Sequence, residues 1–226
     1  MISVIMPTLN AAPHLPRALQ ALAAGVTGGL VKEVIVVDGG SEDETLAIAE
    51  AAGCMIVKAE RGRAKQLRAG ADASKSRWLL FLDADTVLAT GWVEETARFL
   101  SAPQARKKAA VYKLALDDAS VEAKRVVFWA RLRARVMKLP YADQGLLISR
   151  LFYDGIGGYP DIPLMEDVEI MRRIGPKQLV LLETQAVTSA EKYRREGRDT
   201  RALRNLGLMA RYLMGADPVE LAKAYN

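Results

Sequence analysis

Short apolar runs that alternate with helical patterns are the feature that most restricts how this chain can fold. In the first half the runs cover residues 2–6, 34–37, 54–57 and 78–82, and the helical patterns cover 13–24, 42–52 and 64–73. Strands this apolar, separated by helices, are typical of a parallel sheet that is covered on both faces. Ligands bind at the carboxyl ends of the strands in such sheets, so the polar residues found there carry most of the functional information.

The second half of the chain is less regular and turns basic toward its end. We expect strands over 109–116, 146–149 and 178–182, and helices over 121–139, 166–174 and from about Gly197 onward. A glycine-rich turn precedes the helix that begins at Glu166. We therefore expect one α/β domain over residues 1–196, with a basic helical extension over residues 197–226 packed on it.

The composition limits the setting in which the protein works. Cys54 is the single cysteine, so no disulfide forms within the chain and a reducing compartment is the simplest setting. The first apolar run is too short for a signal peptide, and no stretch reaches the ~18 apolar residues of a membrane-spanning helix. We expect a cytoplasmic protein, or one held at the inner face of the membrane. The formal net charge of +5 suits an anionic ligand, an anionic membrane or a nucleic acid and does not choose among them.

Two polar loops follow the first two strands. Residues 7–10, Pro-Thr-Leu-Asn, form on their own a turn with a helix-capping residue. Residues 38–41, Asp-Gly-Gly-Ser, place two glycines beside a carboxylate, so the backbone can approach a ligand closely. Helix capping accounts for Ser41 but leaves Asp38 unexplained. The Asp38 carboxylate is suited to accept a nucleotide base N–H or a ribose hydroxyl.

Four cations gather at the start of the third helix: Arg61, Arg63, Lys65 and Arg68. A helix start favours anions, so cations there call for an explanation. A solvated helix face is one interpretation. An anion-binding loop is the other, because helix-start amides together with Arg and Lys side chains suit a diphosphate.

Two carboxylates, Asp83 and Asp85, directly follow the apolar run at 78–82. Carboxylates one residue apart at the end of a buried strand repel each other. A divalent cation such as Mg²⁺ or Mn²⁺ removes that cost and can bridge the carboxylates to the phosphates of a substrate. This position therefore predicts a metal site.

Further acidic residues lie in the second half. Asp143 precedes an expected strand, and Glu166 and Asp167 open an expected helix. Acidic residues are common in the first turn of any helix, so the pair on its own leaves a structural role open. His14 is the single histidine and follows a proline at a helix start, where we expect a surface or capping role. One His and one Cys cannot build a His/Cys metal site.

The order Pro-Thr-Leu-Asn, Val-Val-Asp-Gly-Gly-Ser, Asp-Ala-Asp, Asp-Gln-Gly and Glu-Asp resembles the family 2 glycosyltransferases of the GT-A fold. The resemblance covers about residues 2–195 and is closest to a bacterial, non-processive subgroup. It implies a Rossmann-like α/β sandwich with a mostly parallel central sheet and a C-terminal helical extension. It also implies an inverting, metal-dependent transfer of a sugar from a nucleotide-diphosphate sugar to an acceptor hydroxyl.

The resemblance implies roles for residues on the donor side. Three residues would line the nucleotide site: Pro7, Thr8 and Asn10. Asp38 would hold the base, and Arg63 and Lys65 would face the base or the diphosphate. Asp85 would bind the Mn²⁺ or Mg²⁺ ion, with Asp83 at the ribose or sharing the metal. Two basic residues would help to neutralise the leaving diphosphate: Arg172 and Arg173.

On the acceptor side, the resemblance implies that Asp143, Gln144 and Gly145 line the site. Asp167 would be the general base, with Glu166 as the alternative. The acceptor itself is not identified, and a lipid-linked acceptor is one candidate. No nucleic-acid partner is expected.

The chain also departs from the family's pattern. Residues 11 and 12 are alanines, where many relatives carry an acid after the Asn of the first motif. The Gln-x-x-Arg-Trp motif of polymerising members is absent, so processive synthesis is not expected.

Two other functions stay open. One is a sugar-phosphate nucleotidyltransferase, although its usual glycine-rich Arg/Lys loop after the first strand is missing. The other is a surface-binding module that has lost catalysis.

The expected helix over 121–139 has an apolar face and a basic stripe. The apolar face holds Phe128, Trp129, Leu132, Val136 and Leu139. The stripe beside it holds Lys124, Arg131, Arg135 and Lys138. A core-packed helix with a solvated basic edge explains this pattern, and so does an in-plane contact with an anionic membrane or a lipid-linked acceptor.

Overall fold

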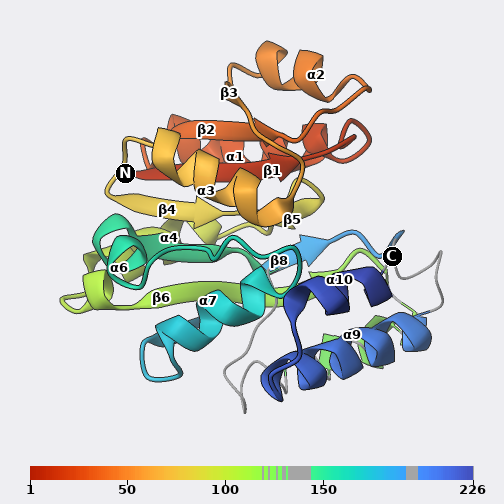
Figure 1. The fold of residues 1–226 in the computed structure, drawn as a ribbon. Helices are drawn as coiled ribbons and strands as arrows, with labels where there is room; N and C mark the ends of the chain where they lie inside the picture. Colours follow the sequence, from red (N-terminus) through yellow and green to blue (C-terminus); the bar gives the residue numbers. More distant parts are fainter. Residues whose placement is uncertain are drawn as a thin grey trace.

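The structure, a computed structural model, describes residues 1–118, 144–191 and 198–225, together with residues 120, 121, 123–125, 127, 128 and 131. Its strands form one eight-stranded sheet in the order β3-β2-β1-β4-β7-β6-β8-β5 (Figure 1). The strands are β1 (Ile2–Thr8), β2 (Val31–Asp38), β3 (Met55–Lys58), β4 (Trp78–Phe81), β5 (Thr86–Leu88), β6 (Ala109–Leu116), β7 (Leu146–Ser149) and β8 (Leu179–Thr188). The helices are α1 (Leu15–Thr27), α2 (Thr45–Ala51), α3 (Arg63–Ala73), α4 (Trp92–Ser101), the 3₁₀ turn η1 (Ala105–Lys107), α6 (Arg150–Gly155), α7 (Glu166–Ile174), α9 (Arg198–Leu213) and α10 (Pro218–Tyr225).

The sheet is mostly parallel, as predicted. Strands β1, β2, β3, β4, β6 and β8 share one direction, and β7 and β5 run against them. β7 lies between β4 and β6, and its first residue, Leu146, pairs with Phe81 at the end of β4. The residues just before β7 therefore lie at the same edge of the sheet as the carboxyl ends of β1, β2 and β4.

Helices cover both faces of the sheet, which confirms a second prediction. α1, α2 and α4 pack on one face, where Trp92 belongs to the core. α3, α6 and α7 pack on the other, where Ile170 is buried. Because successive side chains of a strand point to opposite faces, β1 supplies Val4 to the first core and Ile5 to the second.

α3 lies unusually close to β1 and β2 because a glycine faces these strands. A Cβ atom at Gly70 would lie 2.4 Å from Ile5 Cγ2 and 2.7 Å from Val37 Cγ2. The close approach fixes the height of α3 over the sheet. Its first residue, Arg63, is thereby held at the carboxyl edge.

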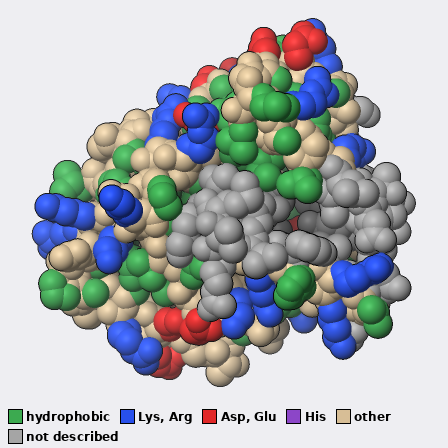
Figure 2. Space-filling view, turned by 90° about the horizontal axis from the view of Figure 1, so that it is seen from below, with side chains coloured by type: hydrophobic (Ala, Val, Ile, Leu, Met, Phe, Trp, Pro, Cys, Tyr) green, Lys and Arg blue, Asp and Glu red, His purple; other side chains and the backbone are tan. Residues whose placement is uncertain are grey.

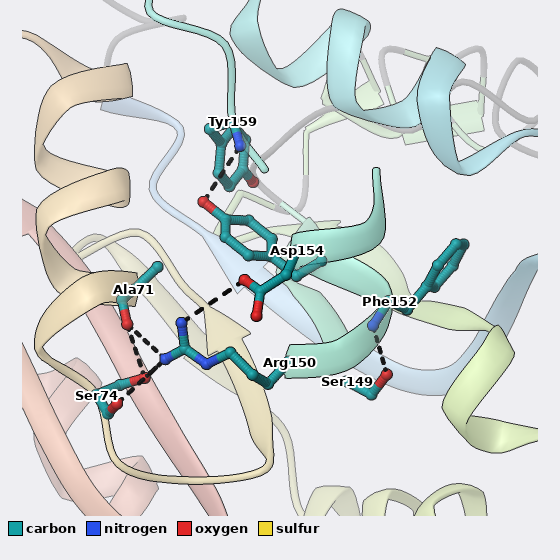
Figure 3. A network of polar contacts seen from close by, with 8 residues as sticks. Ala71, Ser74, Ser149, Arg150, Phe152, Asp154 and Tyr159 are labelled. Carbon is teal, nitrogen blue, oxygen red and sulfur yellow. Dashed lines mark hydrogen bonds and ion pairs between the residues drawn. The ribbon is translucent and has the colours of Figure 1, made fainter. Parts of the chain in front are cut away.

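A polar network ties α6 to the end of α3 (Figure 3). Arg150 donates to two backbone oxygens at the end of α3 and to the Ser74 hydroxyl, and its Nη1 atom lies 3.9 Å from Asp154 Oδ1. After α6 the backbone N–H of Tyr159 donates to the Tyr153 hydroxyl at 3.1 Å. These bonds shape the glycine-rich turn that leads toward α7.

α9 and α10 pack against α7 (Figure 1). A small apolar cluster joins the three helices and includes Val168 of α7, Leu208 of α9 and Leu221 of α10. The Tyr212 hydroxyl also donates to Glu169 Oε2 at 2.9 Å. The basic end of the chain thus rests on the helix that begins with the predicted catalytic acids.

Several elements differ from the prediction. β5, α4 and α6 were not expected, and β8 runs to Thr188 instead of ending at residue 182. β8 continues because exposed Glu183 and Gln185 alternate with more buried neighbours, a pattern that a search for unbroken apolar runs overlooks. Most of the expected helix over 121–139 lies outside the described residues.

Candidate functional site

The loops after β1, β4 and β8 and the start of α3 surround a cavity of about 580 Å³. Its lining includes six residues to which the family resemblance gives a role: Pro7, Thr8, Asn10, Arg63, Asp83 and Asp85. Segments far apart in the chain therefore meet at the sheet edge where a parallel topology predicts a ligand site. A second cavity, of about 540 Å³ between α4 and β8, contains none of the predicted residues in its lining.

The loops after β1 and β2 hold each other in place. Asn10 has a left-handed backbone with φ 51°, which Asn tolerates better than most residues. Its side-chain oxygen accepts the N–H of Glu42 at 2.9 Å, and its own N–H donates to Ser41 Oγ at 2.9 Å. Asn10 thus fixes the rim of the cavity, whatever contact it makes with a ligand.

Asp38 is buried at the end of β2, and its carboxylate serves its own loop. Oδ2 accepts the N–H groups of Gly40 and Ser41, both at 2.9 Å, and Oδ1 accepts the hydroxyls of Ser41 and Thr8. Burial acts to raise the pKa of Asp38, but these hydrogen bonds outweigh burial and hold the pKa below its ordinary value. A carboxylate offers about four acceptor positions, so a base or ribose donor would have to replace one of these bonds.

Gln66 is a site residue that the sequence analysis overlooked. It is buried, lines the cavity, and donates from Nε2 to the backbone oxygens of Thr8 and Val37, both at 2.7 Å. Because both partners are carbonyl oxygens, the NH₂ group must face them. Gln66 therefore joins the ends of β1 and β2. Its position on the buried face of α3, beside Leu67, was the available signal.

Arg63 joins two acidic groups from distant parts of the chain. Its Nη2 atom lies 2.6 Å from Asp83 Oδ1, and its Nη1 atom lies 2.9 Å from Glu166 Oε1. Burial opposes the charge, but the two carboxylates outweigh it and raise the pKa of Arg63 well above its ordinary value. The loop after β4 and the first turn of α7 are thereby linked through one side chain. A contact between Arg63 and a base or diphosphate stays a prediction.

Glu166 and Asp167 differ in their surroundings. Glu166 is buried, and burial together with the charge of Asp167 raises its pKa in spite of Arg63. Asp167 is half-buried, and its Oδ1 atom accepts the N–H of Val168 at 2.8 Å. Of the two acids, Asp167 is therefore the more accessible to an acceptor.

Asp83 and Asp85 are the residues that could hold a divalent cation. Both line the cavity, Asp83 is paired with Arg63, and Thr188 Oγ1 lies 3.4 Å from Asp85 Oδ1. Within the described ranges, no group of three or more His, Cys, Asp or Glu side chains is arranged to hold an ion. Mg²⁺ often takes only one or two protein carboxylates and fills its other positions with water and substrate phosphates. The residues therefore fit an ion that binds together with a diphosphate.

The loop after β8 contributes a second overlooked residue, Glu191, which pairs with His14. His14 Nε2 lies 3.2 Å from Glu191 Oε2, and both residues line the cavity. His14 stands at the N-cap of α1 and its side chain makes no capping hydrogen bond, so of the expected surface or capping role only the side-chain cap is contradicted. The extension of β8 to Thr188, which the prediction missed, is what brings Glu191 to this wall.

Three predicted basic residues are exposed and paired away from the lining of the cavity. Lys65 forms an ion pair with Glu60. Arg172 and Arg173 lie in the last turn of α7 and pair with Glu169 of the same helix, at 3.1 Å and 3.2 Å. Their roles toward a diphosphate stay predictions.

The predicted acceptor-side residues lie just before β7. Gln144 is 2% exposed, and among the described residues its Nε2 atom has no hydrogen-bond partner. Gly145 has φ +65°, and a Cβ atom there would lie 3.3 Å from Leu82 Cδ1, so this position favours glycine. Asp143 lies outside the described residues. The position of β7 puts Gln144 at the same sheet edge as Asp83.

The matches by sequence each cover about half of this chain or less. Residues 3–112 match the family model for glycosyl transferase family 2. The PGL/p-HBAD biosynthesis glycosyltransferase of Mycobacterium bovis (strain BCG / Pasteur 1173P2) is 38% identical over 95 residues, which cover 39% of this chain and 36% of that protein. An uncharacterized glycosyltransferase of Rickettsia bellii is 30% identical over 116 residues, which cover 51% and 37% of the two chains. The matches thus span little more than a third of these relatives.

Solved structures match nearly the whole chain. Glucosyl-3-phosphoglycerate synthase from Mycobacterium tuberculosis, in complex with Mn²⁺, UDP and glucosyl-3-phosphoglycerate, superposes with a TM-score of 0.64 at 19% identity, covering 91% of this chain and 78% of that one. TarS of S. aureus, residues 1–349, gives 0.64 at 17%, covering 98% and 69%. At these identities the likeness shows a shared fold, and it confirms the predicted GT-A sandwich.

Proposed function

Because residues 3–112 match the family model for glycosyl transferase family 2, we propose that the chain transfers a sugar from a nucleotide-diphosphate sugar to an acceptor hydroxyl. One observation carries this proposal. The polar first loop, the basic start of α3 and the acidic loop after β4 meet in a single cavity. Structures of the same fold hold UDP or UDP-glucose with Mn²⁺, or UDP with Mg²⁺, which supports a nucleotide-sugar donor and a divalent cation here.

On the donor side the proposal gives each cavity residue a task. A bound Mn²⁺ or Mg²⁺ ion would supply positive charge that stabilises the leaving diphosphate. Asp85 would hold the ion, while Asp83 stays oriented by Arg63. Thr8 and Asn10 would line the nucleoside, and helix-start amides of α3 would face the phosphates.

On the acceptor side the attacking hydroxyl must lose a proton, so a carboxylate must lie within hydrogen-bond reach of it. Asp167 is the proposed base because it is more exposed than Glu166, whose carboxylate pairs with Arg63. Inversion requires the base to lie on the face of the sugar opposite the leaving group. The buried NH₂ group of Gln144 is a proposed donor to an acceptor or sugar hydroxyl, since it has no partner among the described residues and an unpaired buried donor costs stability.

The proposed location is the cytoplasm, at the inner face of a membrane, with a lipid-linked acceptor. Among the described residues, no helix is both long and apolar enough to cross a bilayer. Large apolar side chains are nevertheless exposed on the second half, among them Phe128 at 61% and Met214 at 79%. Residues 1–196 would form the transferase domain, and 197–226 an extension that shares this surface.

The family and fold comparisons favour a transferase over the two alternatives. Neither a nucleotidyltransferase nor a catalytically silent module is named among the similar proteins described above. A silent module would also need neither Asp85 in the cavity nor Asp167 at the start of α7. The cheapest discriminating observation is whether the protein releases UDP from a UDP-sugar.

The test combines binding with donor hydrolysis. Thermal unfolding is followed with UDP, GDP and dTDP, each with Mn²⁺, Mg²⁺ or EDTA. A true ligand at 100 times its Kd stabilises by about 2.7 kcal/mol. We expect stabilisation by one nucleoside diphosphate only when the cation is present, and cation-dependent release of UDP from UDP-glucose or another UDP-sugar. Stabilisation that persists in EDTA would contradict metal dependence, and stabilisation by no nucleotide would contradict the proposal as a whole.

A further inference from the structure

The start of α3 places one cation between two pairs of acids. Asp83 and Asp85 follow β4, and Glu166 and Asp167 open α7. Arg63 binds the first acid of each pair through a different guanidinium nitrogen, at 2.6 Å and 2.9 Å. The bridged residues are 20 and 103 positions away from Arg63 in the chain. These two contacts link the two acidic segments through one side chain.

We infer that Arg63 is a positioning residue, whose guanidinium sets the distance between the metal-binding loop and the catalytic turn of α7. The inference rests on the proposed function and adds to it. It predicts that Arg63 acts on the rate of transfer through Glu166, whereas the family resemblance gives Arg63 a contact with the base or diphosphate.

The chemistry of the side chain suits this task. A guanidinium is planar, stays charged and offers several fixed N–H donors, so it can hold two carboxylates in a defined geometry. A lysine has one flexible ammonium and cannot fix both partners in the same way. Tyr159, which helps to raise the pKa of Arg63, is buried, and its ring packs edge-on against Phe81 with the ring centroids 5.0 Å apart.

The two acids of each pair also make different contacts, because the first of each pair binds Arg63. Asp83 and Glu166 direct an oxygen at Arg63, while Asp85 and Asp167 accept from Thr188 and Val168 of their own surroundings. Arg63 therefore fixes the first acid of each pair. A displacement of about 1 Å between reacting groups can lower a rate about 10²-fold, so the spacing between these acids matters for turnover.

The first test measures the affinity for UDP in the presence of Mn²⁺. In the positioning role, Arg63 does not contact UDP. Arg63→Met then leaves the affinity for UDP within about threefold of wild type, because loss of the guanidinium only uncovers Asp83 in the loop that is proposed to hold Mn²⁺. In a direct diphosphate role, the affinity falls by about tenfold or more, as expected for a lost hydrogen bond to a charged group. A tenfold loss of UDP affinity would overturn the inference.

The second test measures Mn²⁺-dependent release of UDP from UDP-glucose. Arg63→Met should lower the rate about 10²-fold and Arg63→Lys by less. If Arg63 acts through Glu166, the double variant Arg63→Met/Glu166→Ala is no slower than the slower of the two single variants. A double variant whose loss of rate equals the product of the two single losses would overturn the inference. Arg68→Met is the matched control, since Arg68 is exposed on the same helix and does not line the cavity.

Failure of the proposed function can be told apart from failure of this inference. If wild type binds UDP with Mn²⁺ but does not release UDP from UDP-glucose, the UDP affinity of Arg63→Met still decides the role of Arg63. If wild type does not bind UDP, a double-mutant cycle between Arg63 and Glu166 in thermal unfolding tests the bridge, and additive effects would overturn it. Arg63→Lys keeps the tests usable if Arg63→Met does not fold.

Discussion

At the scale of single residues, the acidic loop after β4 makes the most direct prediction. Asp85→Ala should abolish Mn²⁺-dependent stabilisation by UDP and leave the fold intact, because the proposed metal ligand is lost. Stability without ligand should be unchanged or slightly higher, since two neighbouring carboxylates no longer repel each other. Thermal unfolding with and without UDP and Mn²⁺ measures both effects. A variant stabilised as strongly as wild type would show that Asp85 is not the ligand.

The two acids at the start of α7 can be separated by their amide variants. Asp167→Asn keeps the shape of the side chain but cannot accept a proton, so we expect turnover to fall about 10²- to 10⁴-fold. UDP binding should stay near that of wild type. Glu166→Gln is the matched control and should cost less, because the amide oxygen can still accept from Arg63. A larger loss in Glu166→Gln than in Asp167→Asn would exchange their roles.

At the scale of helices and strands, the packing of α3 predicts opposite effects for two glycines. Gly70→Ala should lower stability by about 1–3 kcal/mol, because the new methyl group would meet Ile5 and Val37 at impossible distances. Gly207→Ala, in α9, should instead stabilise by up to about 1 kcal/mol, because nothing lies within 4 Å and alanine favours a helix. Chemical denaturation of both variants measures the difference. A tolerated Gly70→Ala would mean that α3 can move away from the sheet.

The same elements show how much of the fold and of the candidate site the sequence predicts. The apolar runs predict β1 to β4, and the polar residues after them identify Thr8, Asn10, Asp83 and Asp85 as neighbours, because parallel strands end at one edge. The contact between Arg63 and Glu166 could not be predicted in this way. It depends on β7 entering the sheet against the direction of β4, and no local pattern records that direction. Gln66 was missed because its partners are backbone oxygens, which every sequence contains.

At the scale of the whole molecule, the distribution of exposed apolar and basic side chains predicts membrane binding. Lys and Arg side chains lie beside hydrophobic ones on the face seen in Figure 2. α9 ends near exposed Leu213 and Met214, and it carries exposed Arg211. Arg131, expected in the basic stripe, donates from Nε to the backbone oxygen of Leu114 at 2.8 Å. Each cation near an anionic surface contributes about 1 kcal/mol.

We therefore expect the protein to sediment with phosphatidylglycerol vesicles at low salt and to be released at high salt. The double variant Leu213→Ser/Met214→Ser should bind more weakly, and so should Arg211→Glu. Val26→Ser is the control, because Val26 is similarly exposed on α1, which packs directly on the sheet. Equal binding by all variants, or none by wild type, would rule out this surface.

The insertion of β7 beside β4 has a consequence for how the chain acquires its structure during synthesis. When the ribosome has made residues 1–112, β4 still lacks one neighbour, because that neighbour begins at Leu146. An unpaired apolar strand edge is a hazard for aggregation until it is covered. The edge of β4 that later pairs with β7 therefore stays unpaired while more than thirty further residues are added to the nascent chain. A fragment that ends at residue 112, where the family match ends, would carry that open edge permanently.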